Sequence, residues 1–122
     1  MKLVVSSQDG KFDSPFSARF GRCDTFVFID TESRQWEAKP NPAAAARGGA
    51  GPQAVQFLVN NGAEAVVSGR YGPNAYSALE AAGIAAYIAD EGTPEEILDK
   101  FLAGELEQAG SASGPGLHGG GR

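Results

Sequence analysis

The 122 residues are enough for one domain with its own hydrophobic core and too few for a second core. Apolar residues make up 42% of the chain and charged residues 20%, a balance that favours folding and excludes a chain disordered throughout. Ten Lys and Arg against fifteen Asp and Glu give a net charge of −5, which opposes nucleic acid as a partner because such binding neutralises many phosphates.

Residues 2–7 are predicted to form a buried strand, because they are mostly apolar and β-branched. The chain enters this strand without the apolar region and cleavage site of a signal peptide. No apolar stretch approaches the ~18 residues that span a bilayer. Cys23 is the only cysteine, so it has no internal disulfide partner. We therefore expect a cytoplasmic protein that has no membrane partner.

Two further strands are expected before the first helix. Residues 25–30 are rich in β-branched and aromatic side chains, which favours a second strand. Residues 34–38 alternate well enough to form a third strand that returns antiparallel along the second. Pro40 and Pro42 are expected to end it. The chain thus begins with three consecutive strands.

The second half of the chain alternates between helices and strands. Residues 52–61 form the first expected helix, with an apolar face that consists of Ala54, Val55, Leu58 and Val59. Short apolar strands at 64–68 and 84–88 lie on either side of a helix at 73–82. Such alternation is typical of strands that pair in parallel.

The last helix has the clearest start, because Thr93 supplies an N-cap hydroxyl, Pro94 the first helical position and Glu96 a capping-box carboxylate. Its core-facing residues are expected to be Ile97, Leu98, Phe101 and Leu102. Beyond Glu107 the composition changes to Gly, Ser, Ala and Pro, which favours a flexible tail at 108–122. We therefore expect an α/β domain over residues 1–107 with the order β-β-β-α-β-α-β-α.

Two glycine-rich segments stand at helix starts, where free backbone N–H groups can face an anion. In a parallel sheet both starts open at the carboxyl ends of strands, where ligands usually bind. Glycine followed by proline is also a good helix start that needs no ligand. The candidate binding residues are Gly48, Gly49 and Gly51 in the first segment and Gly69, Arg70 and Gly72 in the second.

A second candidate is the segment that precedes the second strand, Arg19, Phe20, Gly21, Arg22 and Cys23. Its two guanidinium groups could hold an anion although the whole chain is acidic. Positive charge nearby would favour the Cys23 thiolate, which could ligate a soft metal. A lone cysteine is also common as a small core residue, so both roles stay open.

No enzyme is predicted. The sequence has no C-x-x-C, H-E-x-x-H, P-loop or G-x-S-x-G pattern, and its only histidine, His118, lies in the expected tail. Gly49, Gly51 and Ala54 satisfy the spacing of a dinucleotide-binding fingerprint, which leaves a nucleotide binder as a weaker hypothesis. That fingerprint requires a buried strand directly before it, whereas the preceding residues 41–47 are rich in Pro and Ala.

Taken in order along the chain, a set of short motifs resembles the dinitrogenase iron-molybdenum cofactor biosynthesis family. The resemblance covers Met1 to about Leu106. The motifs are Phe20-Gly21-Arg22, Asn41-Pro42, Gly48-Gly49-Ala50-Gly51, Gly69, Gly72-Pro73, Ala82-Gly83-Ile84 and Glu91-Gly92-Thr93. The resemblance implies a ribonuclease-H-like three-layer fold with a mixed five-stranded sheet. Nuclease activity is not expected, because residues 2–7 lack the strand carboxylates that hold a divalent metal.

Members of this family bind or carry iron-molybdenum clusters and their precursors, and the related orange proteins hold a molybdenum-copper sulfide cluster. The resemblance therefore implies such a cluster as ligand, with cluster donor or acceptor proteins as partners. Arg19 stands where many members have histidine before Phe-Gly, so we expect charge pairing and backbone N–H contacts, with Cys23 as the one inner ligand. A metal-free regulatory or protein-interaction module on the same fold is the alternative hypothesis.

Overall fold

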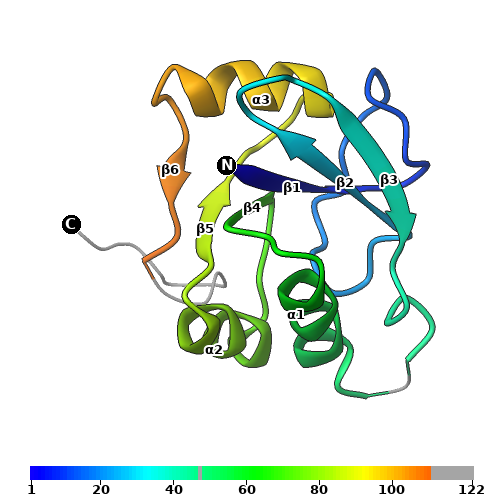
Figure 1. Cartoon of the computed structure of the whole chain (residues 1–122). Coiled ribbons are helices and arrows are strands. Elements are labelled where there is room, and N and C mark those ends of the chain that lie inside the picture. The colour runs from blue at the N-terminus through cyan, green and yellow to red at the C-terminus, as the bar shows by residue number, and fades with distance from the viewer. Residues whose placement is uncertain (47, 111–122) are drawn as a thin grey trace.

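The computed structural model of the chain describes residues 1–46 and 48–110. The predicted tail beyond Gly110, with His118, lies outside these residues. Within them the chain is a mixed α/β domain with a six-stranded sheet, in the order β3-β2-β1-β4-β5-β6, and three helices (Figure 1). None of the described helices has the length and apolar character needed to cross a membrane.

The sheet is antiparallel on one side of β1 and mostly parallel on the other. β2 pairs antiparallel with both β1 and β3, whereas β4 runs parallel to β1 and to β5. β6 pairs antiparallel with β5 at the opposite edge. The strands are β1 (Lys2–Ser7), β2 (Thr25–Asp30), β3 (Trp36–Pro40), β4 (Ala65–Ser68), β5 (Ala85–Ile88) and β6 (Glu107–Gln108).

Helices cover both faces of the sheet, which gives three layers. α1 (Ala50–Asn60) and α2 (Pro73–Ala82) lie on one face, and α3 (Pro94–Leu102) lies on the other (Figure 1). Alternate residues of β1 divide between the two resulting cores: Val4 packs with Leu58 of α1, and Leu3 and Val5 pack with the α3 side. Period-two alternation along a strand therefore fills both cores.

The prediction of five strands is wrong, because β6 adds a sixth. Its two residues, Glu107 and Gln108, are exposed and polar, so no alternating apolar pattern could indicate them. The pairing continues one residue further, where the Ala109 amide donates to the Ala86 carbonyl at 2.8 Å and Ala109 is buried. Gln108 and Ala109 thus belong to the packed structure, although their composition resembles that of the residues beyond.

Other differences occur at exposed positions. β3 lies two residues later than expected and includes Pro40, which an edge strand tolerates. Val59 is 43% exposed and Leu102 is 50% exposed, so their expected core positions are wrong. Both lie in the last turn of a helix, where the apolar face leaves the sheet. The Thr93 capping box of α3 is confirmed, with both of its reciprocal hydrogen bonds present.

Candidate functional site

The site is built where two loops meet above the carboxyl ends of β1 and β4. The loop between β1 and β2 folds back over the sheet, and its Ser17 amide donates to the Ser6 carbonyl at 2.9 Å. Arg19 then forms an isolated parallel bridge with Arg70, and the Phe20 amide donates to the Arg70 carbonyl at 3.3 Å. Two arginines distant in sequence are therefore brought together by main-chain contacts.

Gly69 permits this meeting of the two loops. A Cβ at Gly69 would lie 2.7 Å from Cβ of Ala18 and 2.9 Å from its Cα, which is too close for any side chain. The glycine is therefore required for backbone approach between the loops rather than for contact with a ligand. It does not line the cavity described below.

Gly51 has the same function between α1 and α2. A Cβ at Gly51 would lie 2.8 Å from Cβ of Ala75, so the first turns of the two helices touch. Gly21 packs in turn against Gly51, since a Cβ at Gly21 would lie 3.3 Å from the Gly51 Cα and N. The arginine turn, residues 19–22, is thereby held against both helix starts.

An open cavity of about 390 Å³ lies between the arginine turn, the start of α1 and the start of α2. Its volume is in the range of small-ligand sites, roughly 300 to 1,000 Å³. Most of the predicted binding residues line it: Arg19, Phe20, Gly21, Arg22, Gly49, Gly51, Arg70 and Gly72. Topology and the glycine contacts thus bring together two segments that the sequence presented separately.

The charged groups of the cavity are all cationic. Arg19, Arg22 and Arg70 line it, and among the described residues that do so none carries a carboxylate. In the described part of the chain the ion pair found is between Arg34 and Asp99, at 2.7 Å, away from the cavity. The three cavity arginines are exposed and form no ion pair there, so their charge remains available to an anion.

The first turns of α1 and α2 add backbone donors to this charge. Gly49 and Gly72 are their N-caps, and neither helix has a side-chain cap, in contrast to α3 with Thr93. The first bonds that close the helices run from Gln53 N–H to the Gly49 carbonyl and from Tyr76 N–H to the Gly72 carbonyl. Pro52 and Pro73 have no N–H, so the N–H groups before these bonds belong to Ala50, Gly51, Asn74 and Ala75. These four residues line the cavity, where the helix dipole favours negative charge.

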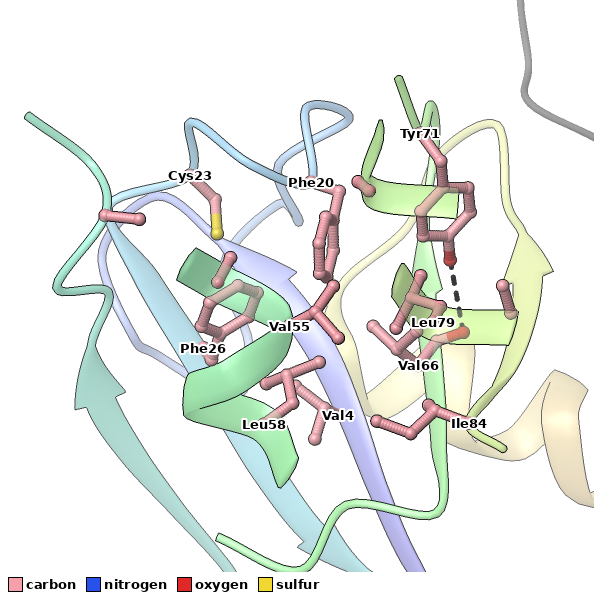
Figure 2. Close-up of a cluster of buried hydrophobic side chains, with 14 of the residues drawn as sticks. Val4, Phe20, Cys23, Phe26, Val55, Leu58, Val66, Tyr71, Leu79 and Ile84 are labelled. Carbon is pink, nitrogen blue, oxygen red and sulfur yellow. Dashed lines mark hydrogen bonds between the residues drawn. The ribbon is translucent and has the colours of Figure 1, made fainter. Parts of the chain in front are cut away.

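Aromatic side chains form the floor of the cavity. The side chains of Phe20 and Tyr71 are both buried, and their ring centroids lie 5.4 Å apart. Figure 2 shows both rings within the cluster of buried side chains. The Tyr71 hydroxyl points away from the cavity into the sheet, where the Tyr87 carbonyl lies at 2.6 Å and the Val66 carbonyl at 3.2 Å. Burial raises the pKa of Tyr71 well above its usual value, so the group stays a neutral donor.

Cys23 does not line the cavity, although it follows the arginine turn directly. Its side chain is 2% exposed and points into the core toward Phe26 (Figure 2). Burial raises the pKa of the thiol to about 12, which outweighs any effect of nearby positive charge. The expectation that the arginines favour a thiolate is therefore wrong for the folded chain. Gly48 also lies outside the cavity lining.

The sequence reasoning missed Tyr71 and the first-turn residues Asn74 and Ala75, which also line the cavity. Tyr71 lies between two predicted binding residues, Arg70 and Gly72, and this position in the chain could have indicated that it lines the site. It also assigned no role to Asn41 beyond a shared motif, although Asn41 is buried and hydrogen-bonded to the arginine turn.

Two other kinds of site, a dinucleotide-binding site before α1 and a metal site with several ligands, lack the surroundings that they require in the described part of the chain. The strand before α1 is the exposed edge strand β3, separated from it by residues 41–49, so the dinucleotide arrangement of a buried strand and an immediate helix is absent here. Among the described residues, no group of three or more His, Cys, Asp or Glu side chains gathers as a metal site. The groups that the cavity offers to a ligand are instead arginine side chains and backbone N–H donors, which suit an anion.

Comparison with known proteins gives four consistent similarities. The family model described as dinitrogenase iron-molybdenum cofactor matches residues 1–104. The apo form of the orange protein from Desulfovibrio gigas superposes with a TM-score of 0.89 at 30% identity, covering 93% of this chain and 96% of that one. A NifB-like protein from Thermotoga has a TM-score of 0.82 at 36% identity, covering 94% and 98%.

An uncharacterized protein of Methanocaldococcus jannaschii is 32% identical over 111 residues, which cover 88% of this chain and 91% of the relative. All these similarities extend over nearly the whole chain. They agree in the fold and in the extent of the domain that builds the cavity.

Proposed function

Because the chain belongs to the dinitrogenase iron-molybdenum cofactor family, we propose that it binds a molybdenum- or iron-containing sulfide cluster, or a precursor of one, in the arginine-lined cavity. One observation carries the proposal. Three arginines without an ion pair in the described part of the chain and two uncapped helix starts open into the same space of about 390 Å³. Such an arrangement selects an anion that accepts hydrogen bonds from several sides.

The side chains at the site fit electrostatic capture better than covalent ligation. Guanidinium groups and backbone N–H groups donate to the sulfide or oxide atoms on the surface of an anionic cluster. The Cys23 side chain is buried in the core and does not line the cavity, so it is not part of the proposed ligand set. A cluster held in this way keeps its own sulfide ligands, which suits a protein that receives and releases it.

The finer features of the proposal follow from the family resemblance. The protein acts as a non-enzymatic carrier in the cytoplasm, its cargo is an iron-molybdenum or molybdenum-copper sulfide cluster, and its partners donate or accept that cluster. A ribonuclease-H-like fold belongs to the same proposal, and the mixed sheet with helices on both faces is compatible with it.

Reconstitution tests the proposal. Purified protein is mixed with tetrathiomolybdate, alone or with copper or iron, desalted, and measured for visible absorption and metal per chain. We expect a coloured protein with stoichiometric molybdenum. Arg19→Ala with Arg70→Ala should weaken retention by roughly tenfold or more, because charge-assisted hydrogen bonds are among the stronger ones.

Arg34→Ala is the matched control for the double variant. It removes one exposed arginine, whose partner Asp99 lies away from the cavity, and leaves the three cavity arginines in place. Its retention of tetrathiomolybdate should equal that of the unaltered protein. A colourless protein under every condition would contradict the proposal and would favour the alternative of a metal-free interaction module.

A further inference from the structure

Asn41 is a buried amide that ties the arginine turn to the loop before α1. It is 5% exposed, and its Nδ2 donates to the Cys23 carbonyl at 2.9 Å and to the Gly21 carbonyl at 3.2 Å. Its Oδ1 accepts from the Ala43 amide at 2.9 Å. These three contacts are with the main chain, and Nδ2 also donates to Cys23 Sγ at 3.8 Å. This single side chain thus fixes two backbone segments relative to each other.

Both segments determine where Arg22 lies. The two carbonyls that receive the Asn41 amide belong to the residues on either side of Arg22. The Arg22 guanidinium donates through Nη1 to the Ala46 carbonyl, which belongs to the loop that Asn41 begins. Asn41 therefore fixes the backbone that carries this arginine and also the loop that accepts its hydrogen bond.

The chemistry of this position requires an amide. Two N–H donors and one acceptor on the same side chain are properties of Asn and Gln, whereas an ionised Asp has only acceptors. An exposed arginine otherwise has many rotamers, and ordering it on binding costs conformational entropy. Asn41 lowers that cost by holding Arg22 before any ligand arrives.

We propose that Asn41 is a positioning residue that orients Arg22 toward the cavity, an inference that rests on the proposed function. Asn41 does not line the cavity and has no direct contact with a bound anion in this assignment. Its whole effect on binding is transmitted by Arg22.

A double-mutant cycle tests this assignment. The unaltered protein, Asn41→Ala, Arg22→Ala and the double variant are titrated with tetrathiomolybdate, and the dissociation constant of each is measured. Asn41→Ala should weaken binding by at least about threefold when Arg22 is present and have almost no effect in the Arg22→Ala protein, since coupled residues are non-additive. If Asn41→Ala does not fold, Asn41→Leu replaces it, because it keeps a similar size and loses both donors without adding a charge.

Asn61→Ala is the matched control, because it removes another hydrogen-bonded amide, at the C-cap of α1 and outside the cavity lining. Asn61 donates to the Phe57 carbonyl at 2.8 Å and accepts from Lys39 at 2.7 Å. Its variant should lose stability without losing affinity. Equal weakening by Asn41→Ala in both Arg22 backgrounds would overturn the assignment of Asn41 alone. Absence of binding by the unaltered protein would overturn the proposed function and this inference with it.

Discussion

Individual residues near the cavity separate into those that face it and those that shape it. Arg19 and Arg70 line the cavity and carry positive charge. Position 69 requires glycine, because Ala18 leaves no room for a side chain there. Cys23 belongs to the second group, since it fills the core beside Phe26. The sequence left Cys23 open as either a metal ligand or a small core residue, and its burial in the core favours the second role.

The burial of the Cys23 thiol leads to a prediction about how the stability of the fold depends on pH. The folded chain raises the pKa of this thiol from 9.0 to about 12, so folding favours the protonated form. The stabilising contribution is complete below pH 9 and is lost as the pH rises toward 12. Between pH 8 and pH 10, the free energy of unfolding should therefore fall by about 1 kcal/mol less in Cys23→Ala than in the unaltered protein.

Urea unfolding of both proteins at the two pH values measures this difference, and other titrating groups cancel because they are common to both. The same variant should bind tetrathiomolybdate as well as the unaltered protein does. If Cys23→Ala folds but no longer binds tetrathiomolybdate, Cys23 is a ligand after all and its assignment to the core alone is wrong.

At the scale of elements, the close contact of α1 with α2 gives the cavity its shape. The two helices start side by side because Gly51 meets Ala75 without an intervening side chain. Neither start is closed by a side-chain cap, while α3, on the other face of the sheet, has a complete capping box. Among the helix starts in the described residues, the two without a side-chain cap are thus the two that border the cavity.

Gly51→Ala should push these helix starts apart. The new methyl group would lie 2.8 Å from Cβ of Ala75, and overpacking of this kind costs about 1 to 3 kcal/mol of unfolding free energy. Removing the opposing methyl group with Ala75→Gly should restore part of the stability and part of the tetrathiomolybdate binding. Thermal unfolding and the binding titration, performed on both variants, measure the two effects.

Gly72→Ala is the control for that pair, because no atom lies within 4 Å of its added Cβ and its φ of −68° suits any residue. Ala is a poorer N-cap than Gly, so the unfolding free energy of this variant should fall, but by less than that of Gly51→Ala, because no overpacking is added. Equal destabilisation by Gly51→Ala and Gly72→Ala would contradict the helix-contact explanation.

The sequence was sufficient for most of the elements and for part of the site. β2, α2 and the capped start of α3 lie where their apolar patterns and turn residues predict. β6 could not be found, because its two residues are exposed and polar and show no strand pattern, and only their pairing with β5 defines them as a strand. The sequence identified the glycines as part of the site but not why each position needs glycine. Gly51 and Gly69 lack room for a side chain because of Ala75 and Ala18, which only the folded chain brings close.

For the whole molecule, the distribution of charge matters more than its sum. The net charge is −5, yet the lining of the cavity carries three arginines and no carboxylate among the described residues. A local positive site within an acidic protein favours a compact anion over an extended polyanion, which the remaining surface repels. This contrast supports a small cluster as ligand rather than nucleic acid.

The most direct test of the central claim is the metal and sulfide content of the protein purified from its native host without added metal. We expect molybdenum or iron together with acid-labile sulfide in roughly stoichiometric amounts in the unaltered protein, consistent with a tight site. Both should be lost from a folded Arg19→Ala, Arg22→Ala, Arg70→Ala variant prepared in the same way. Equal metal and sulfide in both proteins, or none in either, would contradict cluster binding in the arginine-lined cavity.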